Sequence, residues 1–163
     1  MLNLNNETMK KKICITLSRV FPQTHSRRGQ PTGFSDKLAN GTKIHTIRNN
    51  YDLWAVNAEK MQTGKYLLSV RQWINKPYRS KQREINRIDT PIGVEKVRIA
   101  YNAERDEIIA HVKGQFVCAT QLASNDGMSL NDFKDWFAGD KRHKEDCIFN
   151  GVVIHFTSFR YAS

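Results

Sequence analysis

The alternation of apolar and polar residues predicts several β-strands along the chain. In residues 13–18 the apolar positions Ile13, Ile15 and Leu17 recur with the period of two that places side chains on one face of a strand. The same alternation predicts further strands at residues 65–73, 95–101, 107–112 and 152–159, and another apolar run at 115–122. The polar turn at 102–106 joins two of these strands into a hairpin.

Helical spacing of apolar residues interrupts the strands at three places. Residues 34–40 and 51–62 carry apolar side chains three and four positions apart, and a glycine ends each segment, at Gly41 and Gly64. A third helix is expected to begin at Ser129, whose side chain suits an N-cap. Many strands with two or three short helices predict an α+β fold, built as a small barrel or a strongly curved mixed sheet.

The length and composition indicate one domain. A chain of 163 residues can bury a core of its own. We expect residues 1–12 to form a flexible N-terminal tail and residues 13–163 to form a single domain. No stretch is long and apolar enough to predict a membrane span, and the polar opening residues do not resemble a secretory signal. The sequence therefore predicts a cytoplasmic protein that does not enter a membrane.

The charge balance favours a polyanionic partner. The formal net charge is +10 and the isoelectric point is about 9.7, as in many proteins that bind RNA or DNA; a basic protein without such a partner is the alternative. Three widely spaced cysteines without a CxxC pair predict neither a disulfide framework nor a metal site. Two of them, Cys14 and Cys118, lie in apolar runs and are expected to be buried.

Two basic segments, residues 19–32 and 76–83, are candidates for contacts with phosphate. The first contains Arg27 and Arg28 in a loop rich in proline and glycine. Paired arginines beside a pocket often bind phosphate, and an ordinary solvated connection is the equal alternative.

The second basic segment carries Arg79, Lys81 and Arg83 at alternating positions. On a strand these side chains would project from one face and follow a phosphate backbone. Trp73 and Tyr78 lie close by in the sequence as surfaces on which bases would stack. The alternative is an edge strand whose charges protect it from aggregation, which needs no ligand.

The densest cluster of chemically active side chains lies in residues 41–48. Lys43 and Thr46 would face opposite sides of a continuous strand and meet only if the chain turns between them. Thr46 and Arg48 share a strand face. A helix that ends at Gly41 and turns into a short strand would therefore join all three side chains in a cationic pocket that contains a hydroxyl.

These residues resemble the signature of ASCH domains, which belong to the PUA-like superfamily. The pattern Gly-x-Lys-x-x-Thr-Ile-Arg at residues 41–48 is accompanied by segments 64–67, 127–130 and 153–156 at the places expected of the family. The similarity covers most of the chain, and residues 75–115 look like an insertion relative to the smallest members. The resemblance implies a PUA-like compact β-barrel with two or three short helices at its rim and a link to RNA.

The resemblance also implies three alternative functions, none of which requires a metal or a cofactor. The first is binding of RNA or a modified nucleoside in the pocket of Lys43, Thr46 and Arg48. The second follows small family members that remove the acetyl group from N4-acetylcytidine with a lysine, a threonine and a glutamate. These roles fall on Lys43, Thr46 and Asp126, where an aspartate one methylene shorter replaces the glutamate. The third is RNA cleavage by Lys43 with a neighbouring histidine or threonine.

The chemistry of the second function suits these residue types. A threonine hydroxyl becomes a nucleophile when a base takes its proton, and a lysine serves as that base when burial or neighbouring cations lower its pKa. Arg48 would help to lower it, and Asp126 would orient the lysine or pass a proton to the leaving amine. The same residues also describe a binding site without catalysis, with Lys43 and Arg48 on phosphate and Asp126 as a helix cap.

Overall fold

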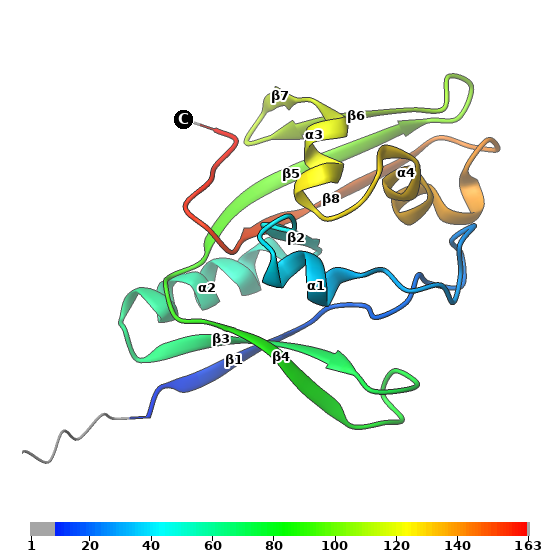
Figure 1. Cartoon of the computed structure of the whole chain (residues 1–163). Coiled ribbons are helices and arrows are strands. Elements are labelled where there is room, and N and C mark those ends of the chain that lie inside the picture. The colour runs from blue at the N-terminus through cyan, green and yellow to red at the C-terminus, as the bar shows by residue number, and fades with distance from the viewer. Residues whose placement is uncertain (1–8, 163) are drawn as a thin grey trace, which may run out of the picture.

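The computed structural model describes residues 9–162 and shows an α+β fold. Within that range eight strands form two sheets, one of three strands and one of five, together with four α-helices (Figure 1). The two sheets do not close into a barrel, so the closed β-barrel expected from the sequence is not found. Of the expected N-terminal tail, residues 1–8 lie outside the described part of the chain.

The smaller sheet has the order β1-β3-β4, with β1 at Lys11–Thr16, β3 at Tyr66–Trp73 and β4 at Gln82–Ile88. β1 pairs with β3 in parallel, whereas β4 pairs with β3 antiparallel. Parallel neighbours need a crossover connection between them. That crossover contains α1, β2 and α2 and therefore carries the polar cluster at residues 41–48 across the interior of the molecule.

The larger sheet has the order β2-β8-β5-β6-β7 and is antiparallel throughout. Its strands are β2 (His45–Arg48), β5 (Gly93–Asn102), β6 (Glu107–Val112), β7 (Gln115–Val117) and β8 (Cys147–His155). Along β5, Val97 and Ile99 are buried while Lys96 and Arg98 are exposed, as expected when only one face of a sheet packs on a core. Residues 75–115, expected to be an insertion, contribute β4, β5 and β6 to the two sheets.

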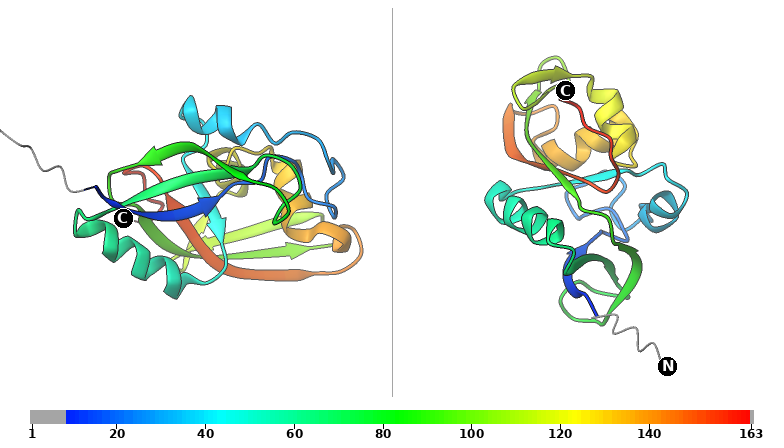
Figure 2. Two further views of the ribbon diagram at one scale, coloured as in Figure 1. Left: turned by 90° about the horizontal axis from the view of Figure 1, so that it is seen from below. Right: turned by 90° about the vertical axis from the view of Figure 1, so that its left-hand side faces the viewer.

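The helices lie between the sheets and on one face of the larger sheet. They are α1 (Phe34–Ala39), α2 (Tyr51–Gln62), α3 (Ala119–Asn125) and α4 (Leu130–Ala138), followed by a short 3-10 helix at Gly139–Lys141. α2 contacts β3, β5 and β8, so it bridges the two sheets, whereas α3 and α4 pack against β6 and β5. Figure 2 shows the smaller sheet at one end of the molecule and the larger sheet with α3 and α4 at the other.

The helix starts have the capping expected of their residues. The side chain of Ser129 accepts a hydrogen bond from the backbone N–H of Asp132, so the predicted N-cap is confirmed. Asn50, which the sequence had not singled out, caps α2 in the same way by accepting from the N–H of Leu53. Across residues 9–162 no helix is long and apolar enough to cross a membrane.

Several strand boundaries differ from the sequence prediction. The chain enters β1 at Lys11 rather than residue 13, and β8 spans residues 147–155 rather than 152–159. The apolar run at 115–122 is not one strand, because β7 ends at Val117 and α3 begins at Ala119.

The prediction of buried cysteines is wrong. Cys14 alternates with the inward-facing Ile13 and Ile15 and is exposed on the other face of β1. Cys118 is exposed because it occupies the cap position just before α3 rather than the interior of a strand.

Candidate functional site

The chain brings Lys43, Thr46, Arg48 and Asp126 to the wall of one small cavity. α1 ends at Ala39, and Gly41, with φ of +80°, continues the turn away from the helix. Lys43 therefore precedes the first residue of β2 instead of lying on it. The turn removes the alternation that would have placed Lys43 and Thr46 on opposite faces.

A buried ion pair forms the floor of this cavity. The Nζ atom of Lys43 donates to the Oδ1 atom of Asp126 at 2.8 Å and to its backbone carbonyl oxygen at 2.6 Å. Both residues are almost completely buried, with 2% and 4% of their surfaces exposed. The ammonium group also lies 4.2 Å from the centre of the Phe34 ring, a cation–π contact. Asp126 is the C-cap residue of α3, but its side chain points inward as an ion-pair partner instead of outward to solvent.

The backbone after Asp126 is shaped to admit the lysine. Gly127 has φ of +81°, a conformation that glycine adopts without strain. A Cβ atom at this position would lie 3.2 Å from the Cβ atom of Lys43. Its carbonyl oxygen accepts a hydrogen bond of 2.8 Å from Lys37, which ties α1 to the start of the next turn. A side chain at residue 127 would crowd Lys43, so both this close approach and the positive φ favour glycine here.

Burial and charge act on this pair in ways that suit proton transfer. Burial lowers the pKa of the Lys43 amine, and Arg48 adds to this, while Asp126 opposes it. Burial alone would raise the pKa of the Asp126 carboxyl, but Lys43 and His45 outweigh it and lower the pKa. Asp126 is consequently a carboxylate at neutral pH, and Lys43 is an amine that gives up its proton more readily than a surface lysine.

Arg48 forms hydrogen bonds that connect the residues of the site to each other and to β1. Its guanidinium group donates to the Oγ1 atom of Thr46 and to the backbone oxygen of Ile47, each at 2.8 Å, and to the backbone oxygen of Thr16 at 2.7 Å. These bonds link β2 to β1, so the group bridges the two sheets. Because Thr46 accepts from Arg48, its own hydroxyl hydrogen is free to point at a ligand.

A second polar layer lies behind Asp126. One member, His45, belongs to the cluster at residues 41–48, whereas Tyr161, Asn125 and Glu95 were not among the predicted site residues. His45 places Nδ1 3.6 Å from Oδ1 of Asp126 and Nε2 2.7 Å from Oη of Tyr161. Tyr161 also accepts from the side chain of Asn125 at 2.9 Å. His155 faces His45 across the β2–β8 pair and bonds Glu95 at 2.7 Å. His45 and Tyr161 lie more than a hundred residues apart in the chain, so no local sequence pattern could have predicted that they meet.

The cavity itself is small, and a larger one adjoins it. Its volume is about 10 Å³, which is room for one water molecule. A second cavity of about 530 Å³ shares Leu17 and Ser18 with it and also contains Trp73 and Tyr78. The two aromatic rings lie 5.3 Å apart between their centres. We call the small space the inner cavity and the larger one the outer cavity.

The predicted basic strand at Arg79, Lys81 and Arg83 is wrong. The chain turns between β3 and β4, with Tyr78 at φ of +62°, and β4 begins only after Lys81. The N–H of Ile74 bonds the carbonyl oxygen of Lys81 at 2.9 Å and closes this turn. Arg79 lies in the turn, Lys81 before the strand and Arg83 within it, so the three exposed side chains do not form one row.

Arg27 and Arg28 also lie away from the inner cavity. Arg27 donates to the carboxylate of Asp132 at 2.7 Å and stacks over Phe21 at 4.8 Å. Arg28 lines a separate cavity that it shares with Asp135. Because Arg27 is paired with an acid and Arg28 shares its cavity with one, the structure does not add support for phosphate binding by this loop.

Comparisons of the chain with family models, with curated proteins and with solved structures find no match. Within the described residues, no three histidine, cysteine, aspartate or glutamate side chains are grouped so that they would hold a metal ion.

Proposed function

We propose that the protein is an ASCH-type domain of the PUA-like superfamily that binds a modified nucleoside, either free or within RNA. The observation that carries this proposal is the meeting of Lys43, Thr46 and Asp126 at an inner cavity that shares Leu17 and Ser18 with an outer cavity lined by Trp73 and Tyr78. The family pattern at residues 41–48 supports the same conclusion independently of the geometry.

The outer cavity supplies what a nucleobase needs. Trp73 and Tyr78 offer ring faces, and a stacked base contributes about 1–3 kcal/mol of binding free energy per aromatic contact. Asn75 and Gln82 line the same cavity and carry amide groups that can both donate and accept hydrogen bonds. The inner cavity has room only for a small group, so the base itself would lie in the outer cavity.

Hydrolysis of an acyl group on that base is the second candidate function. It is favoured by the convergence of a buried lysine of lowered pKa, a hydroxyl and a carboxylate. In this reaction the Lys43 ammonium first releases a proton to solvent, and the neutral amine then takes the proton of the Thr46 hydroxyl, whose oxygen forms a bond to the acyl carbon. The carbon–nitrogen bond breaks, and the departing amine takes the proton back from Lys43. Water then hydrolyses the acyl-threonine ester and releases the acid.

Asp126 has a defined role in this scheme. Its carboxylate accepts from Nζ of Lys43 at 2.8 Å, so it orients the amine and stabilises the ammonium that forms during proton transfer. Arg48, which donates to the Thr46 oxygen, would stabilise the hydroxyl oxygen as it loses its proton.

The test is incubation with N4-acetylcytidine and chromatography of the products. The hydrolase predicts equal amounts of cytidine and acetate from the wild type, loss of product in Thr46→Val, and partial activity in Thr46→Ser, which keeps the hydroxyl. If the wild type releases no cytidine, the hypothesis that it hydrolyses this substrate is refuted. Binding is tested separately by calorimetric titration, where Trp73→Ala should lose affinity and Leu53→Ala, an exposed apolar residue that lines none of the three cavities, should not.

A further inference from the structure

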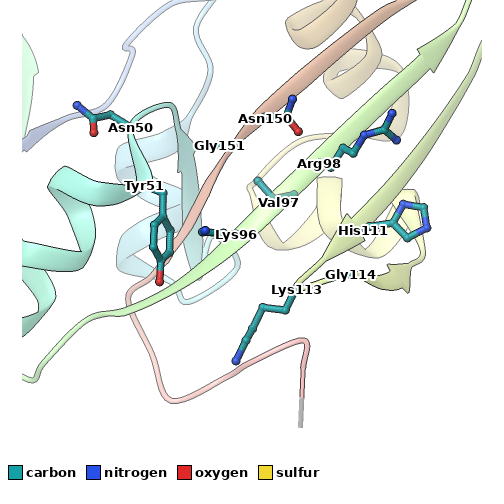
Figure 3. A pocket seen from close by; sticks show the side chains of 10 residues that line it. All are labelled: Asn50, Tyr51, Lys96, Val97, Arg98, His111, Lys113, Gly114, Asn150 and Gly151. Carbon is teal, nitrogen blue, oxygen red and sulfur yellow. The ribbon is translucent and has the colours of Figure 1, made fainter.

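One face of the larger sheet is open to solvent and rich in cations. α3 and α4 contact β6 and β5, and the alternation along β5 turns Lys96 and Arg98 to the exposed side. A cavity of about 550 Å³ lies on this exposed side, as Figure 3 shows. His111 and Lys113 belong to its wall as well. We call this surface, with the neighbouring Phe116, the basic face.

Strand register places the side chains of the basic face in rows. Arg98 on β5 pairs with Asn150 on β8 and with His111 on β6, and His111 pairs with Phe116 on β7. A single row of amide, guanidinium, imidazole and phenyl groups therefore crosses four strands. Phe116 is 71% exposed, and its ring meets that of His111 edge-on at 6.2 Å. An exposed phenyl ring at the end of a polar row is a surface on which a base can stack.

The charges of the basic face have one sign. Ten residues line the cavity, and they include two lysines, one arginine and one histidine but no aspartate or glutamate. In the described part of the chain, no carboxylate forms a salt bridge with Lys96, Arg98 or Lys113. Arg27 and Arg142, by contrast, are paired with acids. The cations of the basic face therefore remain available to an external anion.

The spacing of these cations suits a repeating anion. Lys96 and Arg98 stand two residues apart on one strand, about 7 Å at the rise of a β-strand, which is close to the separation of neighbouring phosphates in an extended single strand. Lys113 lies beside Lys96, since its N–H bonds the Lys96 carbonyl at 2.9 Å. Lys96 also lies 4.8 Å from the ring centre of Tyr51 at the far end of the cavity.

We propose that the basic face is a second binding site, for the backbone of a single-stranded nucleic acid. Lys96, Arg98 and Lys113 contact phosphates, and a base stacks on Phe116. The site shares no residue with the inner and outer cavities, so it stands whether or not those cavities bind a nucleoside.

Fluorescence anisotropy with a labelled 12-nucleotide oligouridine, titrated between 50 and 200 mM salt, tests the site. Each phosphate contact in a single strand contributes about 0.7 to the slope of log K against log salt. The double variant Arg98→Gln/Lys113→Asn should lower the slope by about 1.4, equivalent to roughly 25-fold in affinity at 0.1 M salt. Asparagine is chosen because Lys113 has φ of +50°, which asparagine tolerates.

The matched control is Lys60→Gln/Lys65→Gln, which removes the same charge from α2 and the turn after it. An equal fall in slope in the control would mean that only net charge matters and would overturn the proposal, as would an unchanged slope in the Arg98/Lys113 variant. Phe116→Ala should weaken binding by on the order of tenfold without changing the slope.

Two further arms identify the occupant. Oligothymidine in place of oligouridine distinguishes RNA from DNA, and binding of either one with the expected slope change supports the site. Light scattering reports whether the basic face joins two copies of the chain. A wild-type dimer that dissociates in Arg98→Gln/Lys113→Asn would assign the face to self-association and overturn the proposal.

Discussion

Replacement of Asp126 by asparagine should destabilise the protein through Lys43. The substitution keeps the shape of the side chain but removes the charge that faces the buried ammonium at 2.8 Å. Removing one partner of a buried ion pair typically costs about 3–5 kcal/mol, because the other charge is left in a medium that does not solvate it. We expect Asp126→Asn to lose stability in this range at pH 7.

The lysine can avoid part of this cost by losing its proton. Burial already lowers the pKa of Lys43, and Asp126 is the main group that opposes this effect. Without Asp126 the folded protein would hold Lys43 neutral, while the unfolded chain keeps a lysine with a pKa near 10.4. At pH 7 the difference amounts to about 4.6 kcal/mol, and at pH 9 to about 1.9 kcal/mol. The loss of folding stability at neutral pH is therefore similar whether Lys43 stays charged without a partner or becomes neutral.

The sign of the pH dependence follows from proton counts. In Asp126→Asn the folded state binds fewer protons than the unfolded state, so its stability rises with pH, by up to about 1.4 kcal/mol per unit. Urea unfolding at pH 7, 8 and 9 measures this rise against the double variant Lys43→Met/Asp126→Asn, which has no lysine to titrate. A loss below about 1 kcal/mol at pH 7, typical of surface pairs, would refute the burial of this charge. A single variant that follows the same pH course as the double variant would show that Lys43 stays charged.

Three further outcomes are expected. Gly151→Ala should cost about 1–3 kcal/mol in urea unfolding, because its Cβ atom would lie 2.3 Å from the backbone oxygen of Arg48, whereas Gly93→Ala meets only a flexible arginine side chain and should cost less. Burial and a neighbouring histidine lower the pKa of His155 to about 4, so stability should fall with a slope of up to about 1.4 kcal/mol per unit as the pH drops from about 6.5 to about 4. Replacing His155 by asparagine should flatten this slope, as measured by unfolding at each pH. Trp73→Ala should reduce nucleoside affinity by about 1–3 kcal/mol in calorimetry, and unchanged affinity would place the base elsewhere.

Local sequence signals predicted part of the site. The sequence indicates that Lys43 and Thr46, three positions apart, can meet. Gly41 ends the preceding helix, and the inference needs only the geometry of the turn that follows it. The N-cap at Ser129 is equally local and was confirmed. The pairing of Trp73 with Tyr78 followed from their closeness in the sequence.

Features that depend on distant pairing could not be predicted. The layer behind Asp126 joins His45 to Tyr161, and the row on the basic face requires the register of four strands. The error at Arg79 has a different cause: its segment has the alternation of a strand, but Pro77 and the positive φ of Tyr78 make a turn. Closure of a barrel likewise depends on how sheet edges meet, which alternation along single strands does not specify.

The most direct test of the nucleoside site is a calorimetric titration of the wild type with N4-acetylcytidine, repeated with Trp73→Ala and with Leu53→Ala, an exposed apolar residue outside every cavity described above. Binding at the outer cavity predicts a saturable heat in the wild type and in Leu53→Ala, and a strongly weakened one in Trp73→Ala. No heat in the wild type, or equal affinity in all three proteins, would contradict the assignment of this cavity to a modified nucleoside.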